Sequence, residues 1–345
     1  MRVLIDIGHP AHVHFYRNAI KELQEKNHEV LVTSRDKDVA ISLLEAYGIK
    51  HITLSSMKQG KGNLIKEWII RDIRMLKVAR KFKPDVLTGI SNPSIAHAAW
   101  LLHKKSFIFN DTEHATLGEK ITHPFADFIL TPTCFRKELG KKQIKYEGYH
   151  ELAYLHPNYF VPNPETLKEI GLTEDEKFVV LRFVSWGASH DVGQTGLSPE
   201  IKRKVVQELS KHSRVLISSE KPLEPEFEQY RISVSPEKMH DLLNYATLLY
   251  GESATMASEC AVLGTHSIFC DFAGRGYTDE EESRYGLVFN FKLDKESQEK
   301  SVEKALELIQ NHDIKKEGMQ KREKLLGDKI NVTEFMVEMF EKSLP

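Results

Sequence analysis

The first 25 residues, MRVLIDIGHPAHVHFYRNAIKELQE, set the pattern that decides the fold. The apolar run Arg2–Ile7 predicts a buried strand, a loop of glycine, proline and histidines follows it, and Ala11–Glu25 predicts a helix. Short strand-like runs and longer helical patterns alternate in this way along most of the chain. Such alternation is typical of βαβ units with parallel sheets and right-handed crossovers, so we predict an α/β fold.

The alternation is interrupted once. Residues 154–176 hold three prolines and a run of charges, which is typical of a linker, and a strand-like run restarts at Phe178. We therefore expect two doubly wound, Rossmann-like domains, at residues 1–160 and 161–330, followed by a helical segment at residues 331–345. A cleft that two such domains face is the usual place for a small-molecule site.

Composition excludes several classes of protein. The 345 residues carry a net charge of −2, with 28% charged residues, which is ordinary for a globular chain. This balance gives the whole chain no reason to seek nucleic acid or an anionic membrane. The three cysteines, Cys134, Cys260 and Cys270, are too widely spaced for a zinc motif or a disulfide framework. No apolar run approaches the ~20 residues of a transmembrane helix, and no secretory leader is evident, so we expect a cytoplasmic protein.

The loop after the first strand is a candidate site. It lacks GxGxxG, and GxxxxGK[ST] is absent from the chain, so neither a dinucleotide fingerprint nor a P-loop is present. Gly8 lets the backbone approach a ligand, and His9, His12 and His14 stand at a helix start, where imidazoles can act as bases or meet anionic groups. The alternative is that these histidines only cap and line a turn.

The His12-Val13-His14 sequence also resembles the HxH of metal-dependent hydrolases. Such a site needs further ligands at later strand ends, and Asp111, Glu113 and His114 could supply some of them. The linker and the restart of the pattern argue against a single eight-fold barrel, so we expect no metal.

A second candidate loop, at residues 110–115, follows the strand Ser106–Phe109. Asp111, Glu113 and His114 suit general acid–base chemistry at the carboxyl end of a strand, with Glu119 as a further carboxylate. Capping of the next helix by Asp111 is the alternative interpretation.

A third loop follows the strand Phe178–Val184. Arg182 lies in an apolar run, where an unpaired charge would be costly, and Ser185, Gly187 and His190 form a small-residue loop whose amides could bind a phosphate. A salt-bridged arginine beside an exposed turn would account for the same residues.

The fourth loop, at residues 251–264, is the most specific. Small residues at a helix start leave several N–H groups free to meet a diphosphate, and Glu259 could accept hydrogen bonds from a ribose. A serine-capped helix that ends at Gly264 is the simpler alternative. The residues expected at the diphosphate are Gly251, Ser253, Ala254, Thr255 and Met256.

Two charged segments are expected to be solvated surfaces. The segment Lys66–Lys83 is expected to be a helix with an apolar stripe that includes Ile69 and Ile73. Most of its basic residues are expected on the opposite side, as on an ordinary solvated helix face, so we do not expect it to bind nucleic acid. Thr278–Arg284 is expected to be an exposed acidic turn.

Residues Met239–Gly264 resemble the donor-binding segment of GT-B-type enzymes, especially the non-hydrolysing UDP-N-acetylglucosamine 2-epimerases. Ser253 matches the serine of that family's Ser-Gly-Gly, Glu259 matches its second glutamate, and Ala254 and Thr255 replace the glycines. The stretch NDTEHA, at residues 110–115, resembles the epimerases' His-Val-Glu-Ala and places Glu113 on a catalytic acid. GHPAHVHF is closer to the Gly-His-Val of MurG-type glycosyltransferases, with His12 on their histidine.

Nearly the whole chain, including GYHELAYLHP and GESATMASECAVLG, is similar to the DUF354 family. The resemblances imply a GT-B-like glycosyltransferase of glycan or glycoconjugate biosynthesis, with His12 and Glu113 catalytic and a UDP-linked sugar as substrate rather than a cofactor. They imply a sugar or lipid-linked acceptor, and a C-terminal helix at Thr333–Phe340 that crosses back to the first domain. The alternatives are a sugar epimerase, a metal-dependent hydrolase or a non-catalytic nucleotide-sugar binder, and the oligomeric state stays open.

Overall fold

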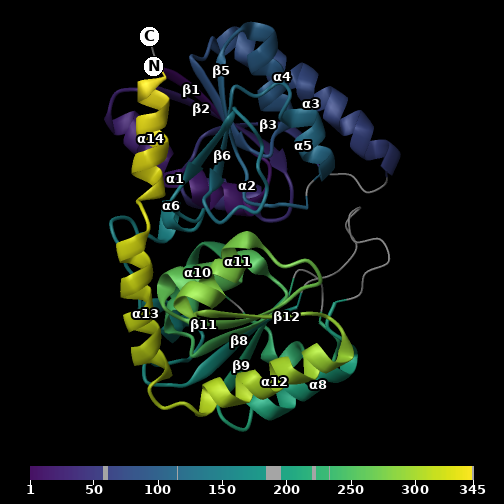
Figure 1. Ribbon diagram of the computed structural model, residues 1–345, viewed down its shortest axis with the longest axis vertical. Coiled ribbons are helices and arrows are strands. Elements are labelled where there is room, and N and C mark those ends of the chain that lie inside the picture. The colour runs from purple at the N-terminus through teal and green to yellow at the C-terminus, as the bar shows by residue number, and fades with distance from the viewer. Residues whose placement is uncertain (57–60, 115, 184–195, 220–222, 233, 344–345) are drawn as a thin grey trace. The chain divides into compact units, whose positions relative to one another are not determined.

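A computed structural model describes residues 1–56, 61–114, 116–183, 196–219, 223–232 and 234–343, with backbone alone at 61–65. The chain divides into two compact units, each with its own sheet (Figure 1). The first unit joins Met1–Tyr159 to Lys329–Pro345, and the second is Phe160–Asp328. No described helix has the length and apolar content that a membrane span requires.

The first unit contains a seven-stranded sheet in the order β3-β2-β1-β4-β5-β6-β7. Every pairing is parallel, as the alternating pattern predicts. The strand order reverses between β1 and β4, so the carboxyl ends of these two strands mark the point where ligands bind in such sheets. The strands are β1 (Arg2–Ile7), β2 (Glu29–Asp36), β3 (His51–Ser56), β4 (Val86–Ile90), β5 (Lys105–Phe109), β6 (Phe128–Pro132) and β7 (Gln143–Tyr146).

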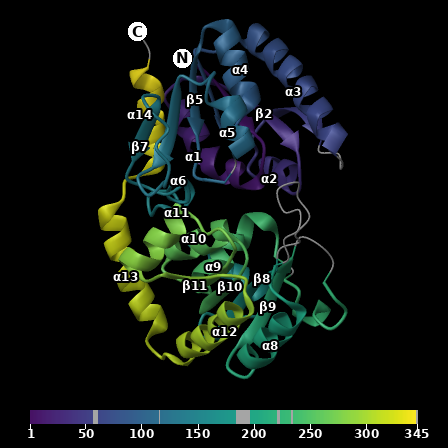
Figure 2. The same cartoon turned by 45° about the vertical axis from the view of Figure 1, so that its right-hand side comes forward.

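Helices cover both faces of this sheet (Figures 1 and 2). One layer holds α3 (Lys61–Phe82), α4 (Pro93–Leu102) and α5 (Thr116–Thr122), with α4 packed between the other two. The opposite layer is built around α1 (Pro10–Glu25), which contacts three further helices. These are α2 (Ala40–Ala46), α6 (Leu152–Leu155) and the C-terminal α14 (Val332–Lys342).

The second unit contains a five-stranded parallel sheet in the order β12-β11-β10-β8-β9. Here the strand order reverses between β8 and β10. The strands are β8 (Phe178–Phe183), β9 (Arg214–Ser219), β10 (Leu248–Gly251), β11 (His266–Cys270) and β12 (Val288–Phe291).

The helices of the second unit pack in two groups. One group is α8 (Pro199–Leu209) with α12 (Lys295–Gln310), and the other surrounds α10 (Ala254–Leu263), which contacts α9, α11 and α13. The bounds of the remaining helices are α7 (Glu165–Glu169), α9 (Met239–Tyr245), α11 (Gly276–Glu280) and α13 (Ile314–Asp328). The short α7 falls inside the segment expected to be a linker.

The predicted orientation of α3 is wrong at Ile69 and Ile73, although Ala79 of the same predicted stripe is buried. Ile69 and Ile73, expected on the buried stripe, are exposed on the same side as Lys66 and Lys77. Some of the buried positions of α3 are occupied by polar residues, because these residues have charged partners there. Arg71, for example, donates a hydrogen bond to Asp6 at 2.5 Å. The inward residues are Glu67, Arg71, Met75 and Ala79.

The acidic segment Thr278–Arg284 is not simply an exposed turn, as predicted from its charges. It spans the end of α11 and a following helical turn, Glu281–Tyr285. Glu281 is fully buried and accepts a hydrogen bond from Ser258 at 2.5 Å. A buried partner on α10 thus offsets the cost of enclosing this carboxylate.

Candidate functional site

The first turn of α1, which follows β1, places His12 at the carboxyl edge of the first sheet. The Gly8 amide donates to His12 Nδ1 at 3.3 Å, while His9 caps the helix by accepting from the Ala11 amide at 3.2 Å. Burial, together with the neighbouring His9 and His150, lowers the pKa of His12 well below its usual range. His12 is therefore neutral at pH 7, and because Nδ1 accepts the Gly8 hydrogen bond, its proton is on Nε2.

His14, also in α1, has different neighbours from His9 and His12. It is buried on the α2 and α6 side of α1, where its Nδ1 lies 3.3 Å from the Tyr47 hydroxyl and its ring lies 5.4 Å from that of Tyr154. Packing in the core explains this placement, so we leave His14 out of the proposed site.

The loop after β5 brings Asp111 to the same edge of the sheet. Asp111 Oδ2 lies 3.0 Å from Nδ1 of His150, and Thr112 donates to Asp111 Oδ1 at 2.9 Å. Burial alone would raise the pKa of Asp111, but the charge and hydrogen bond of His150 and the hydrogen bond from Thr112 hold it well below its usual range. Asp111 is therefore an ionised carboxylate that His150 holds in place.

Three buried polar atoms near Asp111 have no hydrogen-bond partner among the residues that the structure describes: Asn110 Nδ2, the Tyr146 hydroxyl and His150 Nε2. Burial and the charge of Asp111 raise the pKa of Tyr146, which keeps its hydroxyl protonated. Buried polar groups normally find partners, so these atoms suggest a water or ligand at this place. The sequence prediction missed Tyr146 and His150 because it did not recognise β7, the strand that ends at Tyr146 and leads to His150.

The two remaining candidates of this loop differ in exposure. Glu113 is buried, and its Oε1 accepts a hydrogen bond from the Arg136 amide at 3.3 Å. His114 is partly exposed. Helix α5 starts at Thr116, just after this loop.

In the second unit, two segments that were predicted to bind the nucleotide meet where the strand order reverses: the end of β8 and the end of β10. Gly251, the last residue of β10, lies opposite Arg182 of β8 in the register of the sheet. A Cβ atom at Gly251 would lie 2.2 Å from the Arg182 carbonyl oxygen, so only glycine permits this approach. Arg182 Nη1 also donates to Ser218 of β9 at 3.0 Å.

Helix α10 starts directly after this contact. Ser253 caps it, with its hydroxyl accepting from the Met256 amide at 3.3 Å. The amides of Ala254 and Thr255, at the first two helical positions, have no acceptor within the described parts of the chain. They present two N–H groups and the positive end of the helix dipole at the carboxyl edge of the sheet.

Glu259 lies further along α10 and is buried. Its Oε1 lies 2.9 Å from Nε2 of His240 on α9, a partner that the sequence prediction did not identify. Ser185, Gly187 and His190, also predicted to bind substrate, lie outside the described residues.

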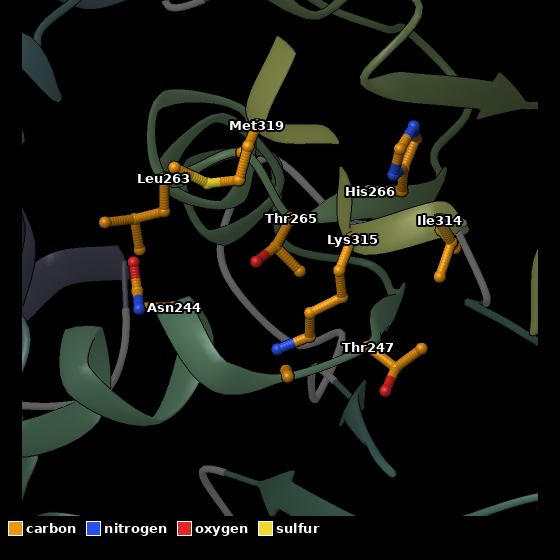
Figure 3. Close-up of a pocket in the computed structure, with 10 residues that line it drawn as sticks. Asn244, Thr247, Leu263, Thr265, His266, Ile314, Lys315 and Met319 are labelled. Atoms are coloured by element: carbon orange, nitrogen blue, oxygen red, sulfur yellow. The ribbon is translucent and has the colours of Figure 1, made fainter. Parts of the chain in front are cut away.

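The pocket in Figure 3 lies elsewhere in the second unit. Its lining includes Thr247 and Thr265, which precede β10 and β11, so it opens at the amino edge of the sheet. Its volume of about 20 Å³ suits a single water molecule. Within the described ranges, no group of three or more His, Cys, Asp or Glu side chains is placed to hold a metal ion.

Comparison with known proteins identifies the family. Residues 1–341 match the family described as protein of unknown function DUF354. The chain belongs to the DUF354 family. It is 25% identical over 283 residues to the uncharacterized protein MJ0665 of Methanocaldococcus jannaschii, covering 78% of this chain and 81% of that protein.

Solved structures define the fold of this DUF354 protein. UDP-GlcNAc 2-epimerase from Neisseria meningitidis, bound to UDP-GlcNAc, is similar with a TM-score of 0.67 and 13% identity, over 99% of this chain and 100% of that one. The spinosyn rhamnosyltransferase SpnG, in complex with spinosyn aglycone, is similar with a TM-score of 0.63 and 13% identity, over the same shares of the two chains. The DUF354 protein therefore has the two-domain α/β fold of GT-B type that was predicted.

Proposed function

We propose that this DUF354 protein is a glycosyltransferase that binds a nucleoside diphosphate sugar, with UDP as the nucleotide, and transfers the sugar to an acceptor hydroxyl. The observation that carries the proposal is the meeting of Arg182, Gly251 and the first turn of α10 at the point of strand reversal in the second unit. A helix N-terminus suits a diphosphate, Arg182 adds a positive charge near the carboxyl end of β8, and this edge is where ligands bind in doubly wound sheets.

Each residue of this half-site has a defined part in the proposal. The amides of Ala254 and Thr255 bind the diphosphate, and Arg182 supplies positive charge. As the bond from the sugar to the diphosphate breaks, negative charge grows on the leaving group, and these donors stabilise it. Glu259 accepts hydrogen bonds from the ribose, and His240 orients its carboxylate.

The first unit supplies the acid–base groups. His12 presents Nε2–H to a substrate oxygen, because the Gly8 amide occupies Nδ1. Glu113 serves as the acid–base carboxylate, and the ionised Asp111 accepts a hydrogen bond from a substrate hydroxyl.

A thermal-shift titration with UDP, UDP-GlcNAc and uridine tests the nucleotide site. A ligand at about 100 times its Kd stabilises the folded state by ~2.7 kcal/mol, so UDP and UDP-GlcNAc are expected to raise Tm and uridine to do so far less. Glu259→Ala removes the carboxylate and abolishes the shift, whereas Glu259→Gln keeps one acceptor oxygen and retains part of it. An unchanged shift in Glu259→Ala contradicts the ribose assignment.

Sugar epimerisation is the second candidate. The likeness to a solved UDP-GlcNAc 2-epimerase favours it, as do several acid–base groups around one edge of the first sheet. Following UDP-GlcNAc by NMR separates the two functions. Inversion at C2 without an acceptor indicates epimerisation, whereas release of UDP that depends on an acceptor indicates transfer.

A further inference from the structure

The outer surface of the layer formed by α3, α4 and α5 combines apolar and basic side chains. Five large apolar side chains on these three adjacent helices are between 51% and 59% exposed. Isolated apolar residues are common at protein surfaces, but several on neighbouring helices of one layer indicate an interaction surface. They are Ile69, Ile73, Trp100, Leu101 and Leu117.

Basic residues extend the apolar pair of α3 in both directions along the helix. Ile69 and Ile73 share one exposed stripe with Lys66 on one side and with Lys77 and Arg80 on the other. The stripe is about 21 Å long at a rise of 1.5 Å per residue. It is an amphipathic surface that faces outward rather than toward the core.

The carboxylates of α3 do not neutralise this stripe. The helix contains seven Lys or Arg residues, of which Arg71 is buried against Asp6, and two carboxylates, both of which have cationic or histidine partners. Glu67 is buried against Arg35 at 2.7 Å, and Asp72 Oδ2 lies 2.8 Å from His97 Nδ1. Helix α4 carries no charged residue. The exposed side of α3 is therefore strongly basic in a chain whose net charge is −2.

We propose that the outer surface of α3, α4 and α5 docks the protein on an anionic lipid bilayer. Lysine and arginine at the rim meet acidic headgroups, while isoleucine, leucine and tryptophan enter the interface between headgroups and acyl chains. Trp100 lies near the end of α4, where it is 57% exposed and its ring is 5.4 Å from that of Phe125. Tryptophan is enriched at membrane–water interfaces because its ring is amphipathic.

Two other occupants fit the surface less well. A symmetric contact with a second copy would press this basic surface against itself, and like charges repel. Nucleic acid would suit the basic residues but gives Ile69, Ile73 and Leu117 nothing apolar to contact. An anionic bilayer satisfies both the charge and the apolar side chains.

Co-sedimentation of the full chain with vesicles tests the proposal. We expect binding to phosphatidylglycerol–phosphatidylcholine vesicles at least tenfold tighter than to pure phosphatidylcholine, and weaker in 0.5 M NaCl. Lys77→Ala with Arg80→Ala is expected to reduce the partition coefficient roughly 25-fold, at about fivefold per charge. Ile69→Ser with Ile73→Ser is expected to reduce it at least tenfold.

Matched controls lie in the second unit. Val161 is 82% exposed, and Lys316 is an exposed lysine, so Val161→Ser and Lys316→Ala should leave vesicle binding unchanged. Urea unfolding of every variant checks that these surface changes preserve the fold. Equal partition onto neutral and anionic vesicles, no binding to either, or the same loss in the controls overturns the proposal.

Two further results would overturn it in favour of another occupant. One is a dimer in light scattering that Ile69→Ser with Ile73→Ser dissociates, since this assigns the surface to a second copy. The other is binding of duplex DNA that the basic variant loses and the apolar variant keeps. None of these outcomes depends on the proposed transferase activity, so the two proposals can fail separately.

Discussion

Replacing Gly251 by alanine probes the contact on which the second half-site depends. The new Cβ atom would lie 2.2 Å from the carbonyl oxygen of Arg182 and 2.9 Å from its backbone nitrogen and carbon. Ordinary contacts of this kind start near 3.4 Å, so β10 and β8 must separate by about 1 Å. Overpacking of a core typically costs 1–3 kcal/mol, and because backbone cannot rotate away, we expect ~3 kcal/mol.

Chemical denaturation and thermal unfolding measure this loss. For a unit of 150–250 residues, ~3 kcal/mol corresponds to a fall in Tm of roughly 6–12 °C. The displaced Arg182 should also weaken UDP binding at temperatures where the variant is still folded. Gly327→Ala is the matched control, because its Cβ meets nothing within 4 Å in α13, and it should be neutral or stabilising by ~0.5–1 kcal/mol. If Gly251→Ala unfolds like the control, the close approach of β8 and β10 is refuted.

Three further predictions concern charge. Asp111→Asn removes an ionised acceptor, so it should weaken binding of UDP-GlcNAc about tenfold or more and leave binding of UDP unchanged. Isothermal calorimetry measures both affinities. An equal loss for both ligands would point to a structural defect. Burial and Lys321 lower the pKa of His266 to about 4. As the pH falls, the unfolded chain protonates this histidine before the folded chain does, so the free energy of unfolding should fall by roughly 3 kcal/mol between pH 6.5 and pH 4. His266→Gln should remove that loss. The hydrogen bond to Asp72 raises the pKa of His97. The pair therefore stabilises the fold fully below pH ~6.5, and this stabilisation is lost as the pH rises through the pKa that His97 has in the folded protein. In urea unfolding, Asp72→Asn should lower the free energy of unfolding by an amount that shrinks with rising pH.

Much of the fold could be predicted because parallel strands in α/β sheets are buried and apolar. Leu4 and Val179, for example, are buried and lie in apolar runs that stand out in the sequence. The strand β7 could not be predicted in this way, because QIKY is short, partly polar and at the sheet edge. Missing β7 also hid His150, the partner of Asp111.

The orientation of α3 shows why side-chain spacing alone was insufficient. Arg71 is a poor candidate for burial on composition, yet Asp6 and Ser55 give it partners inside the first unit. Once Arg71 faces inward, Ile73 must face outward. Such pairings join residues far apart in the sequence, so a single helix cannot reveal them.

Binding of a diphosphate at the first turn of α10 is the basis of the proposed function. Hydrogen–deuterium exchange with and without UDP measures it directly, because the amides of Ala254 and Thr255 have no acceptor among the described residues. We expect UDP to slow exchange in peptides spanning residues 251–257, and we expect Arg182→Ala to weaken this protection. Protection by UDP at other segments, with exchange across residues 251–257 unchanged, would contradict it.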